Sequence, residues 1–187
     1  MSSEDMKRER FERLVLPHMD SAFGLAVWLL RSEAEAEEAV QEAYLRAFRS
    51  FQGFRGEHAR PWLLGIVRNT CYSLLARDRR AGLPEEFNEE NHGEEAVAPG
   101  AVVSFPSNPE SALIQDADRE LVRACLRALP ADFREALVLR EIHGCSYREI
   151  ASIVEAPIGT VMSRIARARR RLESELASRT THKSTGT

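Results

Sequence analysis

The stretch that decides the fold is Ser146–Leu172, SYREIASIVEAPIGTVMSRIARARRRL. It contains two helical patterns joined by a short break, and the second pattern ends in a cluster of arginines. Ser146 with Glu149 predicts a capping box at the start of the first helix, because each side chain can accept a backbone N–H of the other residue. A turn at residues 155–156 follows, and the second helix is expected to begin near Pro157. Two helices joined in this way are typical of a helix-turn-helix unit that reads DNA.

The second helix of this stretch has two contrasting faces. At 3.6 residues per turn one face is apolar and is predicted to be buried; it consists of Val161, Ile165, Ala168 and Leu172. The opposite face carries Gly159, Ser163, Ala166, Arg167 and Arg170, with Met162 and Arg169 on one flank. Small residues allow close approach to base edges, and serine and arginine donate hydrogen bonds to bases and phosphates. This face predicts DNA binding; the alternative is a basic helix that only solvates a small bundle.

Arg164 is the exception among these arginines. It flanks the buried face, so we expect it to pair with an acid inside the same unit, such as Glu149. It is therefore left out of the residues predicted to contact DNA.

The overall composition is that of a globular protein whose charges are unevenly distributed. Of 187 residues, 43% are hydrophobic and 29% are charged, with a net charge of -3. Acidic residues collect in SEAEAEEAVQE and PEEFNEENHGEE, whereas basic residues collect in RNTCYSLLARDRR and SRIARARRRL. This division indicates one surface for nucleic acid and another for a basic protein partner.

Several classes of protein are disfavoured by what the sequence lacks. No apolar run has the length of a membrane span and the first residues have no signal-peptide core, so we expect a cytoplasmic protein without membrane insertion. Cys71, Cys125 and Cys145 form no CxxC pair, which argues against a zinc site and a disulfide framework. The histidines show no spacing of metal ligands or of a nucleophile and its base. We therefore predict no metal, no cofactor and no catalysis, while a redox role for Cys71 or Cys145 stays open.

Apolar residues recur at three and four positions rather than at two, so the fold is predicted to be all-α. Residues 11–30 predict one or two helices near Pro17, Ser32 with Glu35 predicts a capping box before the next helix, and Pro61 begins a helix to about residue 80. Two further helices are expected over residues 111–129 and 130–144. The predicted division is a helical domain at 8–81, a flexible acidic linker at 82–110, a helix-turn-helix domain at 111–177 and a disordered tail at 178–187.

The helix after Ser32 has an acidic outer face. Its apolar stripe consists of Ala36, Ala39, Val40, Ala43, Tyr44, Ala47, Phe48 and Phe51. Opposite the stripe stand Glu38, Gln41, Glu42, Leu45 and Arg49. A leucine centred on an acidic face has no role in folding, although single exposed leucines are common. The face is predicted to bind a partner that offers basic groups around an apolar pocket.

The helix from Pro61 and the loop before it combine aromatic and basic residues. Leu63, Ile66, Val67, Thr70 and Leu74 are predicted to point inward, and Arg68, Asn69, Tyr72, Arg79 and Arg80 outward. The loop FQGFRGEHARPW brings Phe51, Phe54 and Trp62 close to Arg55 and Arg60. Aromatic rings beside arginines suit single-stranded or flipped bases. The alternative is that Phe51 and Trp62 are core residues.

Four segments in order resemble the extracytoplasmic-function sigma factors of bacterial RNA polymerase. They are AEEAVQEAYLRAFRSF, FRGEHARPWLLGIVRNTCYSLLARDRR, LPADFREALVLREIHGCSYREIASIV and PIGTVMSRIARARRRL, and together they cover nearly the whole chain except the linker and the tail. The resemblance implies an alternative sigma factor that binds core RNA polymerase and directs promoter-specific initiation, while the polymerase performs the chemistry. It also implies control by an anti-sigma factor.

The resemblance implies roles for the surfaces described above. A polymerase set would bind the clamp of the largest polymerase subunit: Glu38, Gln41, Glu42, Leu45 and Arg49. The flap of the second-largest subunit is a further expected partner. A minus-ten set would recognise and melt promoter DNA: Phe54, Arg55, Arg60, Trp62, Arg68, Asn69, Tyr72, Arg79 and Arg80. A minus-thirty-five set would read the major groove: Arg140, Gly159, Thr160, Met162, Ser163, Ala166, Arg167 and Arg170. Two tethered readers gain affinity only on DNA with the correct spacing.

Three other functions explain less of the sequence. An ordinary helix-turn-helix regulator accounts for the second half of the chain but leaves the acidic helix and the aromatic loop without a role. A mimic that titrates an anti-sigma factor would not need Asn69 and Arg167. An enzyme is disfavoured because no motif has catalytic spacing.

Overall fold

The structure is a computed structural model that describes residues 3–55, 58–80 and 120–184. The chain divides into two compact units. Helices α1 to α4 belong to the first unit, whereas α6, α8 and most of α7 belong to the second. Every regular element in the described residues is helical, which confirms the predicted all-α class. The predicted linker and the predicted start of a helix at residue 111 lie outside the described residues.

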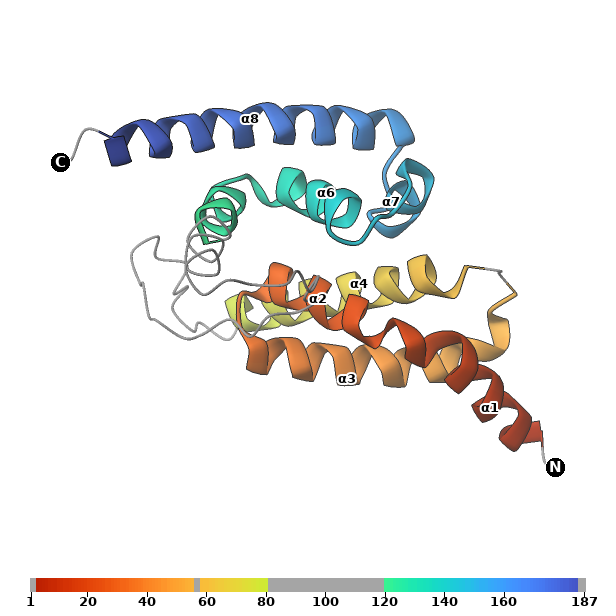
Figure 1. Cartoon of the computed structure of the whole chain (residues 1–187). Coiled ribbons are helices and arrows are strands. Elements are labelled where there is room, and N and C mark those ends of the chain that lie inside the picture. Colours follow the sequence, from red (N-terminus) through yellow and green to blue (C-terminus); the bar gives the residue numbers. More distant parts are fainter. Residues whose placement is uncertain (1–2, 56–57, 81–119, 185–187) are drawn as a thin grey trace, which may run out of the picture. The chain divides into compact units, whose positions relative to one another are not determined.

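The first unit is a bundle of α-helices with two short 3-10 turns (Figure 1). Its elements are α1 Ser3–Val15, η1 Leu16–His18, α2 Met19–Leu30, α3 Glu33–Ser50, η2 Phe51–Gly53 and α4 Ala59–Arg80. Helices α2, α3 and α4 pack against one another, and α1 contacts α4 and η2. Of the one or two helices predicted near Pro17 the structure has two, because η1 separates α1 from α2. Pro61 lies in the first turn of α4, where its missing N–H leaves no hydrogen bond unmade.

Small side chains bring the helices of this bundle close together. Ala36, Ala39, Ala43 and Ala47 form a fully buried row on α3. The facing side of α4 contributes large buried residues, among them Leu63, Leu64 and Val67. Thr70 is also fully buried, and its hydroxyl donates to the Ile66 carbonyl at 2.8 Å, so no polar atom is left unpaired there. The predicted apolar stripe of α3 and the inward face of α4 are therefore the core of this unit.

Tyr44 connects α3 to the end of α1, and its titration is a first prediction. Its hydroxyl donates to the Val15 carbonyl at 3.3 Å. Burial, and after it the negative charge of Asp20, raises the pKa of Tyr44 from 10.0 to about 12. The neutral phenol is thus favoured in the folded state, so its contribution to stability is complete below about pH 10 and is lost as the pH rises through about 12.

The measurement is a spectroscopic titration of phenolate absorbance in the full chain and in Tyr44→Phe. We expect the substitution to remove an ionisation near pH 12. Loss of an ionisation at the ordinary value instead would contradict the packing described for this residue.

The second unit has a helix of which residues 120–127 are described, followed by α6 Ala131–Glu141, α7 Tyr147–Ile153 and α8 Ile158–Ser184 (Figure 1). Pro130 is the N-cap of α6, and α6 packs against α8. The predicted capping box at α7 is confirmed in both directions. The Glu149 N–H donates to the Ser146 hydroxyl at 3.2 Å, and the Ser146 N–H donates to the Glu149 carboxylate at 2.7 Å. Gly144 lies in the connection between α6 and α7, and its φ of 63° is a left-handed conformation that glycine adopts readily.

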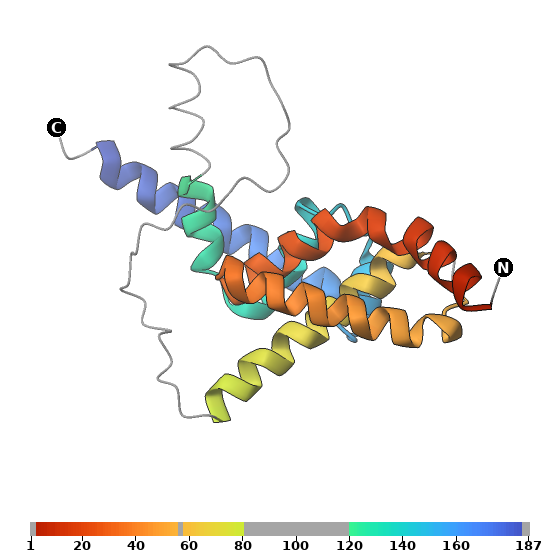
Figure 2. The same ribbon diagram turned by 90° about the horizontal axis from the view of Figure 1, so that it is seen from below.

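Helix α8 is longer than the sequence predicts. The chain from residue 178 is expected to be a disordered tail, but the helix continues through Ser184 (Figure 2). The ion pair of Arg179 with Glu175 at 3.6 Å joins successive turns of the helix at the start of the predicted tail. The prediction is wrong for residues 178–184 because a helix can continue on local interactions without burying an apolar face.

Candidate nucleic-acid and polymerase interfaces

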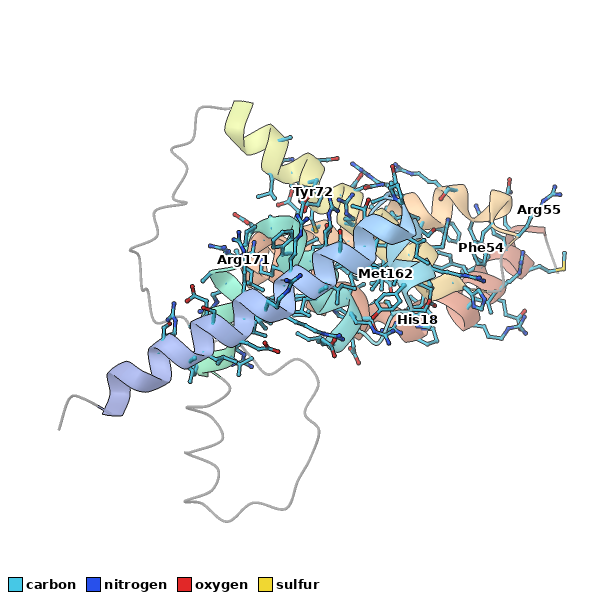
Figure 3. All side chains as sticks on the ribbon, turned by 90° about the horizontal axis from the view of Figure 1, so that it is seen from above. His18, Phe54, Arg55, Tyr72, Met162 and Arg171 are labelled. Carbon is cyan, nitrogen blue, oxygen red and sulfur yellow. The ribbon has the colours of Figure 1, made fainter. Side chains whose placement is uncertain are left out.

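The two faces of α8 are separated as the sequence predicts. Val161, Ile165 and Ala168 are at most 1% exposed, and Leu172 is half-buried. The opposite face is open to solvent and consists of Gly159, Met162, Ser163, Ala166, Arg167 and Arg170. Met162 stands on α8 with 51% of its surface exposed, and Figure 3 labels it. Thr160 is half-buried. An exposed row of small, hydroxyl and guanidinium groups on one helix can approach base edges and phosphates.

Arg164 forms an ion pair within its own unit, with a different acid from Glu149. Its guanidinium pairs with Asp132 of α6 at 2.6 Å. The predicted partner, Glu149, accepts the Ser146 N–H in the capping box. The prediction that Arg164 pairs with an acid of its own unit is therefore confirmed, but the acid is Asp132 and not Glu149, the example given. Asp132 lies in the first turn of α6, where a carboxylate is also favoured by the helix dipole.

Arg140 of the minus-thirty-five set takes part in the connection between α6 and α7. Its guanidinium donates to the Cys145 carbonyl at 2.9 Å and lies 4.8 Å from the centre of the Tyr147 ring. On the flank of α8, Arg169 pairs with Glu141 at 2.6 Å, and this hydrogen bond raises the pKa of Arg169 further. Both arginines thus have partners within the unit, which orients them and reduces the charge that they offer to DNA.

A hollow of about 280 Å³ beside the exposed face contains an arginine that the sequence analysis missed. It is lined by Phe133, Arg167, Arg170 and Arg171. The Arg171 guanidinium lies 5.4 Å from the centre of the Phe133 ring, which restricts its orientation. Within the described residues, no carboxylate pairs with these three arginines. Three guanidinium groups without a paired carboxylate, placed around one hollow, suit a phosphate. In the sequence, the run of arginines at 169–171 was the signal that could have pointed to Arg171.

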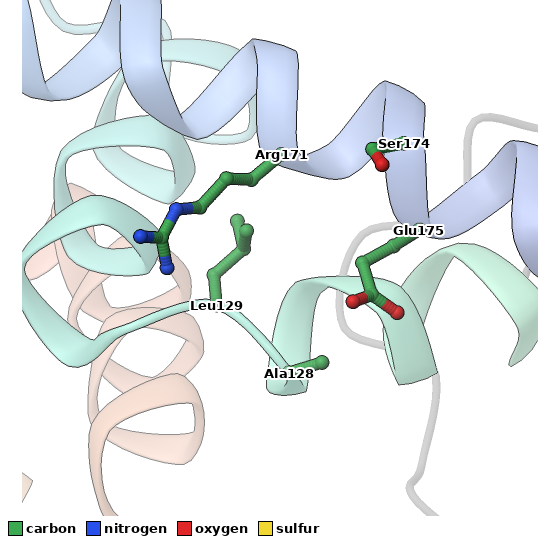
Figure 4. Close-up of a pocket in the computed structure, with 5 residues that line it drawn as sticks. All are labelled: Ala128, Leu129, Arg171, Ser174 and Glu175. Carbon is green, nitrogen blue, oxygen red and sulfur yellow. The ribbon is translucent and has the colours of Figure 1, made fainter.

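Arg171 also borders a second hollow, of about 240 Å³ (Figure 4). Its other lining residues are Ala128, Leu129, Ser174 and Glu175. Leu129 is 3% exposed, so its side chain belongs to the core of the unit. Glu175 gives this hollow a negative group, which makes it a poorer place for a phosphate than the first hollow.

The aromatic loop before α4 is anchored by a stack of rings. Phe51 is 1% and Phe54 is 7% exposed. Their rings stack at 5.7 Å with an interplanar angle of 17°, and the Phe54 ring lies 4.7 Å from that of Trp62. Membership of the minus-ten set implies that Phe54 lies on the surface. The structure instead places Phe54 in the core. Trp62 is half-buried, and Arg55 is exposed at the edge of the unit (Figure 3).

The outer face of α4 presents Asn69 together with a cation–aromatic pair. The Arg68 guanidinium lies 4.7 Å from the centre of the Tyr72 ring and donates to the Asn69 side-chain carbonyl at 3.4 Å. Asn69 is exposed. The side chains of Arg79 and Arg80 lie outside the described residues. An amide beside an arginine stacked on a tyrosine offers hydrogen bonds and a flat surface to an unpaired base.

Arg60, at the start of α4, lies close to His18 of η1. Burial, and after it the positive charge of Arg60, lowers the pKa of His18 below its usual value. Arg60 is half-buried. It is therefore closer to the body of the unit than the exposed Arg55.

The polymerase set lies on the outer face of α3. Leu45 is 53% exposed, and Gln41 and Arg49 are exposed as well. Glu42 pairs with Arg46 at 2.8 Å and Glu38 pairs with Arg77 of α4 at 3.5 Å. Such exposed pairs contribute little to stability. Leu45 is therefore an apolar side chain in contact with water, surrounded by acids that are oriented by arginines.

The described residues contain no group of three His, Cys, Asp or Glu side chains that could hold a metal ion. None of the helices described here has the length and apolar character needed to cross a membrane. The three cysteines are buried and unbonded to one another, and burial raises the pKa of the Cys125 thiol. A buried thiol with a raised pKa reacts slowly.

Comparison with known proteins agrees with both units. Residues 14–81 match the family described as Sigma-70 region 2, and residues 119–172 match Sigma-70, region 4. The RNA polymerase sigma-H factor of Pseudomonas aeruginosa is 35% identical over 177 residues, covering 90% of this chain and 87% of that protein. The ECF RNA polymerase sigma-E factor of Escherichia coli K12 is 37% identical over 144 residues, covering 76% and 74% respectively.

A solved structure agrees as well. The sigma factor RpoE from Bartonella quintana, co-crystallised with the anti-sigma factor NepR, has a TM-score of 0.66 and 29% identity, covering 90% of this chain and 98% of that chain. The chain therefore belongs to the sigma-70 family of transcription initiation factors. Within that family it is an extracytoplasmic-function sigma factor of bacterial RNA polymerase.

Proposed function

We propose that this sigma factor selects promoters through two separate surfaces, the exposed face of α8 and the outer face of α4 with its preceding loop. The observation that carries the proposal is the division of α8 into a buried apolar face and an exposed face of small residues and arginines. Only the exposed face is free to enter a major groove, where glycine, serine and alanine allow close approach and Arg167 can read a guanine. The polymerase, and not this chain, would catalyse nucleotidyl transfer, and both would act in the cytoplasm.

For the minus-thirty-five element we assign base reading to Ser163, Ala166 and Arg167. The hollow lined by Arg167, Arg170 and Arg171 would hold a backbone phosphate beside the bases that are read. Arg140 would act indirectly, because its hydrogen bond to the Cys145 carbonyl stabilises the connection that precedes α7.

For the minus-ten element we assign Arg55, Trp62, Asn69 and Tyr72. These side chains combine an exposed cation, a half-buried ring, an exposed amide and a ring covered by Arg68. Because Phe54 is buried, it would pack against the Trp62 ring instead of contacting a base. Unpaired bases need such flat surfaces and hydrogen-bond partners once the duplex opens.

The acidic face of α3 would bind the core polymerase, with Leu45 entering an apolar pocket. Regulation by an anti-sigma factor is supported by the solved relative, which is bound to one. An anti-sigma factor that covered Leu45 or the exposed face of α8 would block polymerase binding or promoter recognition. Either block would be reversed when the anti-sigma factor dissociates, without any chemical change in this chain.

Arg167→Ala tests the assignment of the α8 face. We expect transcription from the selected promoter to fall by roughly 5- to 100-fold, since one bidentate arginine–guanine pair contributes about 1–3 kcal/mol of discrimination. Core polymerase affinity should not change, because Arg167 lies in the other unit from α3. The measurement combines run-off transcription on a promoter library with a binding titration against sigma-free core polymerase.

Arg179→Ala is the matched control on the same helix. Arg179 is exposed and pairs with Glu175, beyond the residues that match the region 4 family. It should transcribe the same promoters as the unchanged protein. Equal promoter selection by Arg167→Ala and Arg179→Ala would show that the exposed face of α8 does not read the minus-thirty-five element.

A further inference from the structure

Helix α1 makes aromatic contacts, although none of its residues belongs to the proposed polymerase or DNA surfaces. The match to the region 2 family begins at residue 14, so most of α1 precedes it. Phe11 is 6% exposed, and its ring meets those of Phe48 and Phe51 edge-on, both at 5.2 Å. It also meets the Tyr44 ring at 6.3 Å. Edge-to-face geometry is specific, because the positive edge of one ring faces the negative face of the other.

These contacts continue without a gap to the aromatic loop. Phe11 contacts Phe51, the Phe51 ring stacks on Phe54, and the Phe54 ring lies 4.7 Å from that of Trp62. The chain of rings thus runs from α1 through η2 to the first turn of α4. It joins the two sides of the loop that contains the exposed Arg55 and the half-buried Trp62.

Two cations of α1 strengthen its hold on the same rings. The Lys7 ammonium lies 4.3 Å from the centre of the Phe48 ring, and the Arg10 guanidinium lies 5.2 Å from that of Phe51. Both distances are within the range of a cation–π attraction. Helix α1 therefore contacts the η2 segment through a ring and a cation, and moving α1 would disturb both contacts.

We propose that α1 is a positioning element for promoter opening, and that Phe11 is its principal residue. By packing on Phe51 it would keep Phe54 and Trp62 in the arrangement from which Trp62 and Arg55 can receive unpaired bases. The proposal rests on the minus-ten role assigned to these two residues. Phe11 itself would not touch DNA.

The physical reason is a shift of population. When a loop has several arrangements and only one can capture a base, the rate of opening is proportional to the fraction of molecules in that arrangement. Loss of the ring contacts of Phe11 would let the loop leave that arrangement while the alanine row and the α4 core keep the bundle folded.

The test is promoter opening by the complete sigma–polymerase complex carrying Phe11→Leu. Leucine keeps an apolar side chain at this position but removes the ring edge. Opening would be followed with a fluorescent adenine analogue in the minus-ten element. We expect opening of duplex promoter to be about five- to tenfold slower, as the loss of one or two aromatic pairs allows. On a template already unpaired through the minus-ten element, initiation should proceed at the unchanged rate.

Arg10→Ala is a second variant that does not risk misfolding, because Arg10 is exposed. It should slow duplex opening about two- to fivefold, again without an effect on the unpaired template. Phe23→Leu is the matched control: it replaces a half-buried phenylalanine of α2 that makes no ring contact among the described residues. It should open both templates at the unchanged rate.

Two results would overturn the proposal. Unchanged opening of duplex promoter by Phe11→Leu would show that α1 does not position the loop. Equal slowing on duplex and unpaired templates would show general damage to the unit. The underlying minus-ten assignment is checked separately with Trp62→Ala and Arg55→Ala. If these two also open duplex promoter normally, the assignment itself fails; if they are slow and Phe11→Leu is not, only the role of α1 fails.

Discussion

Leu45→Arg is expected to lower the affinity of this sigma factor for core RNA polymerase by roughly 30- to 1000-fold. That range corresponds to the loss of about 2–4 kcal/mol that is typical of a central interface residue. Leu45 is 53% exposed on an acidic face, so the folded chain alone gains little from it. If it enters an apolar pocket, a guanidinium in its place would be desolvated without a partner. A binding titration with sigma-free core polymerase measures the change.

Leu16→Arg is the control for this prediction. Leu16 is another exposed leucine of the first unit, 40% exposed, but it lies on η1 and outside the polymerase set. Both variants should keep the thermal stability of the unchanged protein, because neither side chain is buried. Normal polymerase binding by Leu45→Arg would remove the outer face of α3 from the interface.

Phe51→Ala is expected to lower the free energy of unfolding of the first unit by about 3–5 kcal/mol, the usual loss when a buried phenylalanine is truncated. Phe51 is 1% exposed and meets the rings of Phe11, Phe54 and Trp62. Alanine would remove all of these contacts and leave a cavity that rigid helices cannot close. The denaturant midpoint should therefore fall, with little change in the slope of the transition.

Tryptophan fluorescence is a suitable readout for this unit. The chain has 2 tryptophans, Trp28 in α2 and Trp62 in α4, and both lie in the first unit. Phe48→Ala, at a half-buried ring of α3, should cost less. A midpoint for Phe51→Ala equal to that of the unchanged protein would show that the ring stack does not hold the loop and bundle together.

Local interactions explain why so much of the fold was predictable. The predicted capping boxes at Ser32 and Ser146 connect residues three positions apart. Both hydrogen bonds of the box are present at Ser146, and at Ser32 the hydroxyl accepts the Glu35 N–H. The buried faces of α3 and α8 follow from the 3.6-residue repeat, since every third or fourth side chain must share a face. The exposure of Leu45 and of the α8 residues follows from the same repeat, so the positions of most candidate site residues could be predicted.

Contacts between distant residues explain what was missed. Arg164 could pair with any acid near its flank of α8, and only the packing of α6 on α8 selects Asp132 over Glu149. Phe54 and Trp62 have the composition of a base-stacking loop, yet one ring is in the core and the other is half-buried. The hollow beside Arg171 likewise needs Phe133, which lies on another helix.

The sequence by itself determined the helices, their caps, their inner and outer faces and the resemblance to a sigma factor, because each depends on residues within a few positions or on a continuous motif. The tertiary structure alone decided which ring of the loop is buried, which acid restrains Arg164 and how α1 is joined to the loop. A side chain with several possible partners acquires one of them only when helices far apart in the sequence pack together and exclude the others.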